Sequence, residues 1–441
     1  MPMGVTAVTD TAKFNASALD ELIAKRQEPA WLVDLRRAAF ETFCEKAMPS
    51  RKEEEWMRTD IRTFHLDKFD LPAELTEIPA DLPSGLLTEG VDLGGRLVSY
   101  NSRTVSSELS EELKAQGVIF GSFSEVLASH PEIVRKHFAH AVDPHFDKFS
   151  AMHAAFFTTG QVLYVPRGVV VKKPLHALSL LGAGGVDLGH TLVILDEGAE
   201  ATMLNETASI DESAPGLHCG AIELFVHPRA RLRYINLQNW GHGVWHFAHQ
   251  KGIVERDAHI QWTIGALGSK LSKVNQHVAL AGVGAESEVN GVMFTEGRQH
   301  LSYHTLQHHE APNCRSNFLY KTALQDRSRT VWRGMIKVDK DAQKTDGYQR
   351  NDNLLLTEHC RADSIPGLEI EADDVRCTHG ATIGRVDEEQ IFYAQCRGFT
   401  RKEAIRAIVI GFFQQVFDRI PVESVREALG KAIAVRVRDY E

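Results

Sequence analysis

A unit of about 30 residues that returns from residue 190 onwards constrains the fold of this chain more than any other sequence feature. Short apolar runs alternate there with polar turns, and a small or apolar residue begins each new alternating segment. This residue recurs at Ala199, Ala230, Ala258, Ala285, Ser328, Cys360 and Val375. The spacing clusters near 30, with one longer gap after Ala285 and one half step before Val375. Self-similarity at such a period is typical of stacked structural units.

The repeat predicts a mainly β fold whose core, residues 156–396, is a parallel β-helix. A unit with so few apolar residues cannot bury its own face, whereas stacking one unit on the next creates a continuous interior. A β-sandwich is the alternative, and it would show hairpin turns roughly every 8 to 12 residues. Asn290–Gly291 is the clearest hairpin signal of that kind. The return of the small residue at one phase favours the solenoid.

Helices are expected on both sides of this core. In the N-terminal region, residues 1–155, apolar residues recur every four positions within 17–48, with Pro29 in a first turn and Pro49 at the end. A mixed segment with Pro and Gly punctuation follows, with helical character near 124–141.

The C-terminal region, residues 397–441, is predicted to form two helices. Thr400 and Glu403 form a capping box, and Pro421 ends the first helix. Its apolar stripe is wider than one packing face needs, so it can cap the open end of the solenoid, dock a partner protein, or do both. The residues expected to meet a partner are Ile405, Ile408, Val409, Phe412 and Phe413.

Composition limits the kinds of binding partner and the cellular compartment that we expect for this chain. With 49 basic and 59 acidic side chains the formal charge is −10, which argues against nucleic acid and anionic lipid as partners. Six scattered cysteines and an N-terminus without a basic and apolar leader predict a cytoplasmic protein. The longest apolar run, residues 407–413, is far shorter than the roughly 18 to 20 residues of a membrane span, so we expect no membrane segment.

Cys377 and His379 are the residues that could carry chemistry. Residues two apart on a strand point the same way, so both share one face. If consecutive repeat positions lie on neighbouring rungs, Cys360 lies beside Val375 and within reach of Cys377. Thiolate and imidazole suit iron, zinc and Fe–S clusters. Inert packing of the two cysteines is the alternative, because free Cys is commonly buried.

Other chemistry is poorly supported by the sequence. A Cys–His nucleophile needs the two side chains to meet, whereas neighbours on one strand face diverge. His300, His304 and His308 are predicted to form a solvent-facing polar row on a strand, with a metal site as the alternative. The chain has no phosphate-binding G-x-x-x-x-G-K-[ST] loop, so we expect it to bind no nucleotide, and no C-x-x-C, which argues against a structural zinc site.

Three segments, residues 50–60, 304–356 and 368–404, resemble the SufB/SufD family of Fe–S cluster assembly scaffolds. The resemblance extends from about residue 30 to the end of the chain. The sequence Cys377-x-His379-Gly380 is similar to SufD-type chains, since SufB-type chains carry a glutamate after the histidine. Cys360 departs from many SufD-type chains, because it falls where SufB-type chains carry their assembly cysteine.

The resemblance implies a right-handed parallel β-helix and a non-enzymatic role. It implies a nascent Fe–S cluster held transiently and shared with a partner, with His379 as the leading ligand and Cys377 and Cys360 as further ones. It also implies a SufC-like ABC-type ATPase on the C-terminal helices and a SufB-like subunit, or a second copy, on the β-helix. Alternatives are a solenoid enzyme of the polysaccharide lyase or acyltransferase type, a SufB-like self-pairing scaffold, and a structural interaction protein with inert Cys and His. The acidic and basic strand row of a lyase and the six-residue period of an acyltransferase are both missing from the sequence.

Overall fold

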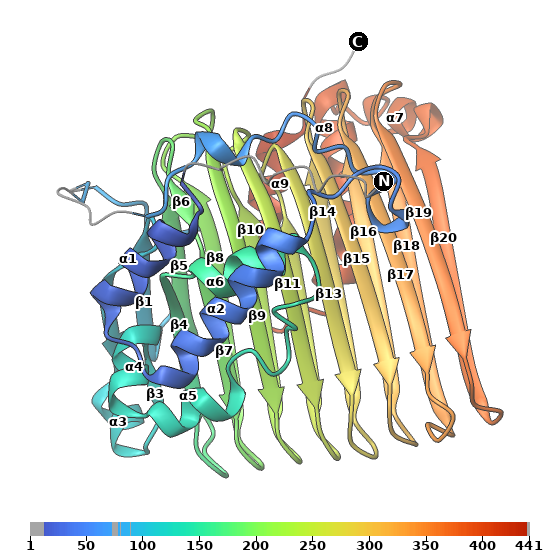
Figure 1. The fold of residues 1–441 in the computed structure, drawn as a ribbon. Coiled ribbons are helices and arrows are strands. Elements are labelled where there is room, and N and C mark those ends of the chain that lie inside the picture. The colour runs from blue at the N-terminus through green and yellow to red at the C-terminus, as the bar shows by residue number, and fades with distance from the viewer. Residues whose placement is uncertain (1–12, 73–77, 80, 89, 439–441) are drawn as a thin grey trace, which may run out of the picture.

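Two long β-sheets face each other in the computed structural model, which describes residues 13–72, 78–79, 81–88 and 90–438. The chain winds between them in eight coils, from β4–β5 to β19–β20, and helices cover the outer faces (Figure 1). Sheet A contains, in spatial order, β2 (Arg103–Leu109), β1 (Gly95–Tyr100), β5 (Leu175–Leu181), β8 (Glu200–Ser209), β10 (Arg231–Asn239), β12 (His259–Ala266), β14 (Glu286–Thr295), β16 (Arg315–Leu324), β18 (Thr345–Leu355) and β20 (Val375–Arg385).

In sheet B the strand of the last coil lies at one edge and the strands of the first coil lie at the other. This sheet contains β19 (Arg361–Ile370), β17 (Arg329–Val338), β15 (His300–His309), β13 (Leu271–Leu280), β11 (Val244–Val254), β9 (Gly216–Val226), β7 (Gly189–Leu195), β4 (Thr159–Val165) and β3 (Ile119–Ser122), with the short β6 (Val186–Asp187) beside β9. The coil strands pair in parallel within each sheet, so the predicted parallel β-solenoid is confirmed and the β-sandwich alternative is wrong. Asn290–Gly291, which suggested a hairpin, lies inside β14.

The predicted period matches the register of the first four repeat positions. Glu200, Arg231, His259 and Glu286 are paired rung by rung, and each follows one of the alanines at 199, 230, 258 and 285. Those alanines are buried at a corner of the coil. The residue before each one has a left-handed backbone, at Gly198, Arg229, Asp257 and Gly284. The tight turn therefore fixes both the backbone and the size of the next side chain.

The later repeat positions lie elsewhere than predicted. The next residue of this corner row is Cys314, which precedes β16. Ser328 and Cys360 lie at the opposite corner, before β17 and β19, where Arg329 pairs with Arg361. The longer gap after Ala285 is thus a change from the first corner to the opposite one. The half step before Val375 is the change back.

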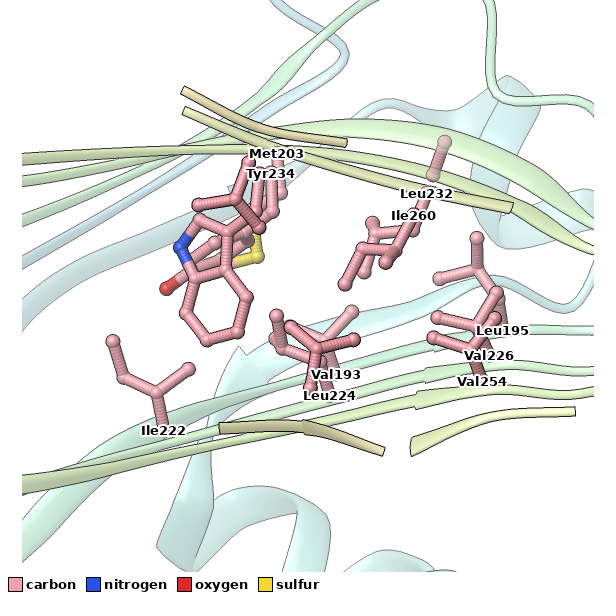
Figure 2. Packing of buried hydrophobic residues seen from close by; sticks show 14 of the residues in the cluster. Val193, Leu195, Met203, Ile222, Leu224, Val226, Leu232, Tyr234, Val254 and Ile260 are labelled. Atoms are coloured by element: carbon pink, nitrogen blue, oxygen red, sulfur yellow. The ribbon is translucent and has the colours of Figure 1, made fainter. Parts of the chain in front are cut away.

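The interior between the sheets is apolar over most of its length. Figure 2 shows Met203 and Tyr234 of sheet A facing Val193 and Leu224 of sheet B, and all four side chains are fully buried. This row of contacts continues from coil to coil, so each coil completes the core of its neighbour.

The helices confirm much of the helical prediction. They are α1 (Ala16–Arg26), α2 (Ala30–Glu45), η1 (Glu54–Trp56), η2 (Leu66–Lys68), α3 (Glu111–Ala115), α4 (Phe123–Ser129), α5 (Pro131–His137), α6 (Lys148–Phe156), α7 (Glu388–Gln395), α8 (Arg401–Phe417) and α9 (Glu423–Arg436). Pro29 is the N-cap of α2, and the capping box of Thr400 and Glu403 begins α8. The boundaries at 155/156 and 396/397 stay a prediction; β1 to β3 precede the first boundary and α7 precedes the second.

The C-terminal helices do not cap the solenoid, which corrects one of the two predicted uses of their apolar stripe. α8 and α9 pack along the outer face of sheet A, against Leu237, Val292 and Leu319, whereas α2 and α6 lie over sheet B (Figure 1). None of the helices in the described part of the chain is long and apolar enough to cross a membrane.

Candidate functional site

The last coil, formed by β19 and β20, brings two of the predicted site residues together. Cys377 pairs with Gly347 and His379 with Gln349 on the neighbouring strand β18. The Gln349 side chain is fully buried and donates to the carbonyl oxygen of Gly367, so this face of the sheet points into the solenoid. Cys377 and His379 therefore share the interior face of the terminal strand, as the sequence predicted.

Cys377 is half-buried in a small apolar cluster of the last two coils. It packs against Ile336 and Val338 of β17. A Cβ atom at Gly347 would lie 3.2 Å from the Cys377 Sγ, so the glycine leaves room for the thiol. Burial raises the pKa of the thiol, which therefore stays protonated near neutral pH until a metal ion or base takes its proton.

His379 is exposed, and its ring makes no hydrogen bond with any described residue. Within the described ranges, no group of three His, Cys, Asp or Glu side chains gathers closely enough to hold a metal ion. The terminal coil thus offers one imidazole and one thiol, which is half of a four-ligand set.

Cys360 does not join this pair, because the register prediction that placed it beside Val375 is wrong. It lies at the corner after β18, whose last residue, Leu355, pairs with Arg385. At roughly 3.3 Å per residue this corner is roughly 26 Å along β20 from Cys377. The Cys360 thiol is buried and donates to the carbonyl oxygen of Thr357 at 3.1 Å.

An apolar rim surrounds Cys377 and His379, and sequence reasoning missed it. Leu368, Ile370 and Ile383 point into the solenoid but are 39%, 40% and 51% exposed, because no coil follows. Neither β19 nor β20 has a further strand on its outer edge in the described part of the chain. The alternation of Leu368 and Ile370 with charged residues was a signal of an interior face that the last coil leaves open.

The row of His300, His304 and His308 lies on the outer face of β15, as predicted, but solvent does not cover all of it. The N-terminal segment around η1 crosses this face. His304 Nδ1 lies 2.5 Å from Glu55 Oε2, and Arg333 pairs with both Glu54 and Glu55. His304 also contacts the Lys273 ammonium of β13, at 2.8 Å from Nε2. His308 faces two carboxylates, Glu310 and Asp339, which raise its pKa. The run of acidic residues before Trp56 was the sequence signal of this contact.

The five residues expected to meet a partner divide into two groups. Ile405, Val409 and Phe413 are buried against sheet A within this chain. Ile408 and Phe412 are half-buried and line a cavity of about 460 Å³ with Val386 and Gln390. Close by in the sequence, α7 exposes two large aromatic side chains, Phe392 at 68% and Tyr393 at 60%.

Fold and site together define a β-solenoid protein with one open end that carries a thiol and an imidazole. Residues 180–412 match the SufBD core domain of the SUF system for FeS cluster assembly, and residues 17–177 match the SufBD N-terminal region. The chain belongs to the SufBD family of Fe–S cluster assembly proteins.

Relatives of nearly full length agree with this assignment. An Iron-sulfur cluster assembly SufBD family protein of Staphylococcus epidermidis is 28% identical over 91% of this chain and 89% of the relative. The Iron-sulfur cluster assembly protein SufB of Bacillus subtilis is 27% identical over 92% and 89%. A SufBD family protein of Staphylococcus aureus is 27% identical over 91% and 89%. The SufD-like assignment made from Gly380 stays a prediction.

Proposed function

We propose that the chain is a non-enzymatic scaffold subunit on which an Fe–S cluster is built at the contact between its terminal coil and a second SufBD chain. The observation that carries this proposal is the open terminal coil, where Cys377 and His379 lie inside an exposed apolar rim. The cluster is cargo, held transiently, and this chain supplies only part of its ligands.

The second chain is proposed to continue the solenoid. Unpaired strand edges and exposed interior side chains favour addition of another coil, because it satisfies the backbone groups and buries the apolar rim together. A SufB-like subunit is the proposed partner, and a second copy of this chain is the alternative. In either complex the contact would shield the Cys377 thiol and the His379 imidazole from water.

The ligand proposal is tested by co-expressing the chain with SufB-like and SufC-like partners, purifying without oxygen, and measuring iron and sulfide in the complex. H379A is expected to lower both to less than about a tenth of wild type, and C377S to lower them less, because loss of a ligand leaves the site incomplete. H65A, which removes an exposed histidine of the N-terminal region, is the matched control. Unchanged iron and sulfide in H379A with an intact complex would contradict the ligand role.

Cys360 remains a separate proposed ligand, at its own corner of the coil. The C360S variant decides between its two roles in the same experiment. A lower cluster content in an intact complex would make Cys360 a ligand, whereas wild-type content would make it a packing residue.

The SufC-like ATPase is proposed to dock on the C-terminal helices at the surface formed by Ile408, Phe412, Phe392 and Tyr393. Exposed aromatic side chains beside a cavity are typical anchors of protein interfaces. F392D/Y393D is expected to lose co-purification of the ATPase, while V435D, at a residue of α9 that is 78% exposed, is expected to retain it. Retention by both variants would contradict this surface.

A further inference from the structure

A cleft of about 430 Å³ lies on the outer face of sheet B and reaches Glu369 of β19, on the face of that strand opposite to Leu368 and Ile370. Its floor is made by β11, β13, β15 and β17. The loop of residues 141–146 forms one wall, and Glu55 of η1 lies at another. This volume is within the range of roughly 300 to 1,000 Å³ in which proteins bind small organic molecules.

Both walls are fixed by contacts to the sheet. The fully buried carboxylate of Glu223 accepts hydrogen bonds from the backbone N–H groups of Ala139, Ala141 and Val142 at 2.7 to 2.8 Å. The opposite wall is held by the pairing of Glu55 with Arg333 at 2.9 Å. The cleft is therefore formed before any ligand arrives.

One row of the floor changes from polar to apolar across four adjacent strands. Lys251, His277, Leu306 and Met335 are successive cross-strand partners on the outer face. With strands roughly 4.8 Å apart, this row is roughly 14 Å long, about the length of a two-ring aromatic molecule with an acidic group. Phe146, which is 55% exposed, adds an aromatic face beside it.

The polar end of the row has binding capacity that the chain itself does not use. The Lys251 ammonium makes no hydrogen bond or ion pair with any described residue. The buried Nε2 atom of His277 likewise has no hydrogen-bond partner within the described ranges. A buried polar atom without a partner is costly, so a ligand that supplies one gains affinity.

The remaining charges of the cleft are already engaged. Arg333 is paired with Glu55, and Lys337 is paired with Glu369 at 3.0 Å. Asp143 accepts a hydrogen bond from the backbone N–H of His145 within its own turn. Burial lowers the pKa of His277 to about 3, so this ring is neutral at pH 7 and Lys251 supplies the free positive charge.

From these observations we infer that the cleft binds a small organic anion with a flat apolar body. The acidic group lies at Lys251 and His277, and the body rests on Leu306 and Met335 beside Phe146. This site is separate from the proposed cluster ligands and does not depend on the function proposed above.

The inference is tested on the full chain with two fluorescent probes that share one aromatic body. 1-Anilinonaphthalene-8-sulfonate carries a sulfonate, and N-phenyl-1-naphthylamine is its uncharged counterpart. K251M is expected to weaken sulfonate binding at least about tenfold and to leave the uncharged probe within about twofold, because a charge-assisted contact is lost. L306W, which fills the floor, is expected to weaken both probes at least about tenfold.

Two controls and one substitute variant make the result decisive. K402M removes a lysine on α8, and I383D alters the terminal coil; neither is expected to change the binding of either probe. If K251M unfolds, H277Q takes its place with the same expected direction. The inference is overturned if K251M behaves like K402M, or if I383D abolishes the fluorescence, since the probe would then lie at the terminal coil.

Discussion

The two ends of the solenoid are built differently although the coils between them follow one pattern. At the first end β2 runs antiparallel to β1, and β3 runs antiparallel to β4, so the chain reverses and ends each sheet with a short strand. At the last end β19 and β20 are full-length parallel strands with open edges. Chain reversal at an edge prevents the next coil from adding in register, whereas a parallel edge permits it. We therefore expect a second chain to add at the last end and not at the first.

The largest expected effect comes from placing charge in the open rim. The double variant L368D/I383D should weaken end-to-end association about a thousandfold, because the proposed contact would bury both apolar side chains, and burial of such a side chain contributes up to roughly 1.5 to 3 kcal/mol. Sedimentation velocity of the complex with the SufB-like partner, or of the chain alone for self-pairing, measures the change. S106D on β2 places a charge at the other end and should leave association unchanged. Equal loss in S106D would show that the ends are equivalent.

Glycine variants compare a contact between two inner coils with a contact to the last coil. A Cβ at Gly291 would lie 2.2 Å from Tyr320 Cδ1, so G291A should lower the free energy of unfolding by about 3 kcal/mol through overpacking. At Gly347 the nearest atom is the Cys377 Sγ at 3.2 Å on an edge strand that can move. G347A should therefore cost about 1 kcal/mol or less. Denaturant unfolding measures both, and equal losses would mean that the last coil is as rigid as the inner ones.

The first end of the solenoid, where the chain reverses, carries a buried carboxylate whose titration can be measured. Asp187 receives a hydrogen bond from Ser102, beside the turn between β1 and β2, and burial raises its pKa to about 6. The folded state thus holds this proton more tightly than the unfolded chain, and the penalty of ionisation is present above pH 6 and fades as the pH falls toward 4. D187N should stabilise the fold by about 2 kcal/mol at pH 8 and by little at pH 4. Thermal unfolding against pH checks this, and a gain independent of pH would contradict it.

The smallest effect is expected on the outer face of the terminal strand. Arg376 pairs with Asp346, but the arginine side chain is 78% exposed, so R376A should change stability by less than about 0.5 kcal/mol. It should also leave association and cluster content unchanged, because residue 376 points away from the interior that holds Cys377. A loss as large as that in H379A would place the functional face on the outside of the sheet.

The sequence predicts those parts of the fold in which a single structural constraint selects the residue type. Ala199, Ala230, Ala258 and Ala285 gave the correct coil length, because a tight corner tolerates only a small side chain. They could not predict that Ser328 belongs to the other corner, since both corners impose the same restriction. Thr400 and Glu403 located the start of α8, but an apolar stripe does not say which surface it covers. For that reason the outer face of sheet A was missed.

The site was predicted in part for the same reasons. The two-residue period of a strand was enough to place Cys377 and His379 on one face. Cys360 depends on the corner that it occupies, which a periodic signal with two equivalent corners leaves undetermined. The cleft beside Lys251 was beyond sequence reasoning, because it needs the pairing of four strands and a loop from residues 141–146.

The contact of Arg333 with Glu54 and Glu55 spans 278 residues of sequence to the nearer glutamate. During synthesis the segment that contains these glutamates leaves the ribosome long before β15 and β17 exist. At roughly 5 to 20 residues per second, it waits roughly 15 to 60 seconds for its docking surface. Trp56 is buried sooner, because its ring packs against Phe149 of α6 and Phe247 of β11. The apolar part of this segment can therefore dock before its two glutamates find Arg333.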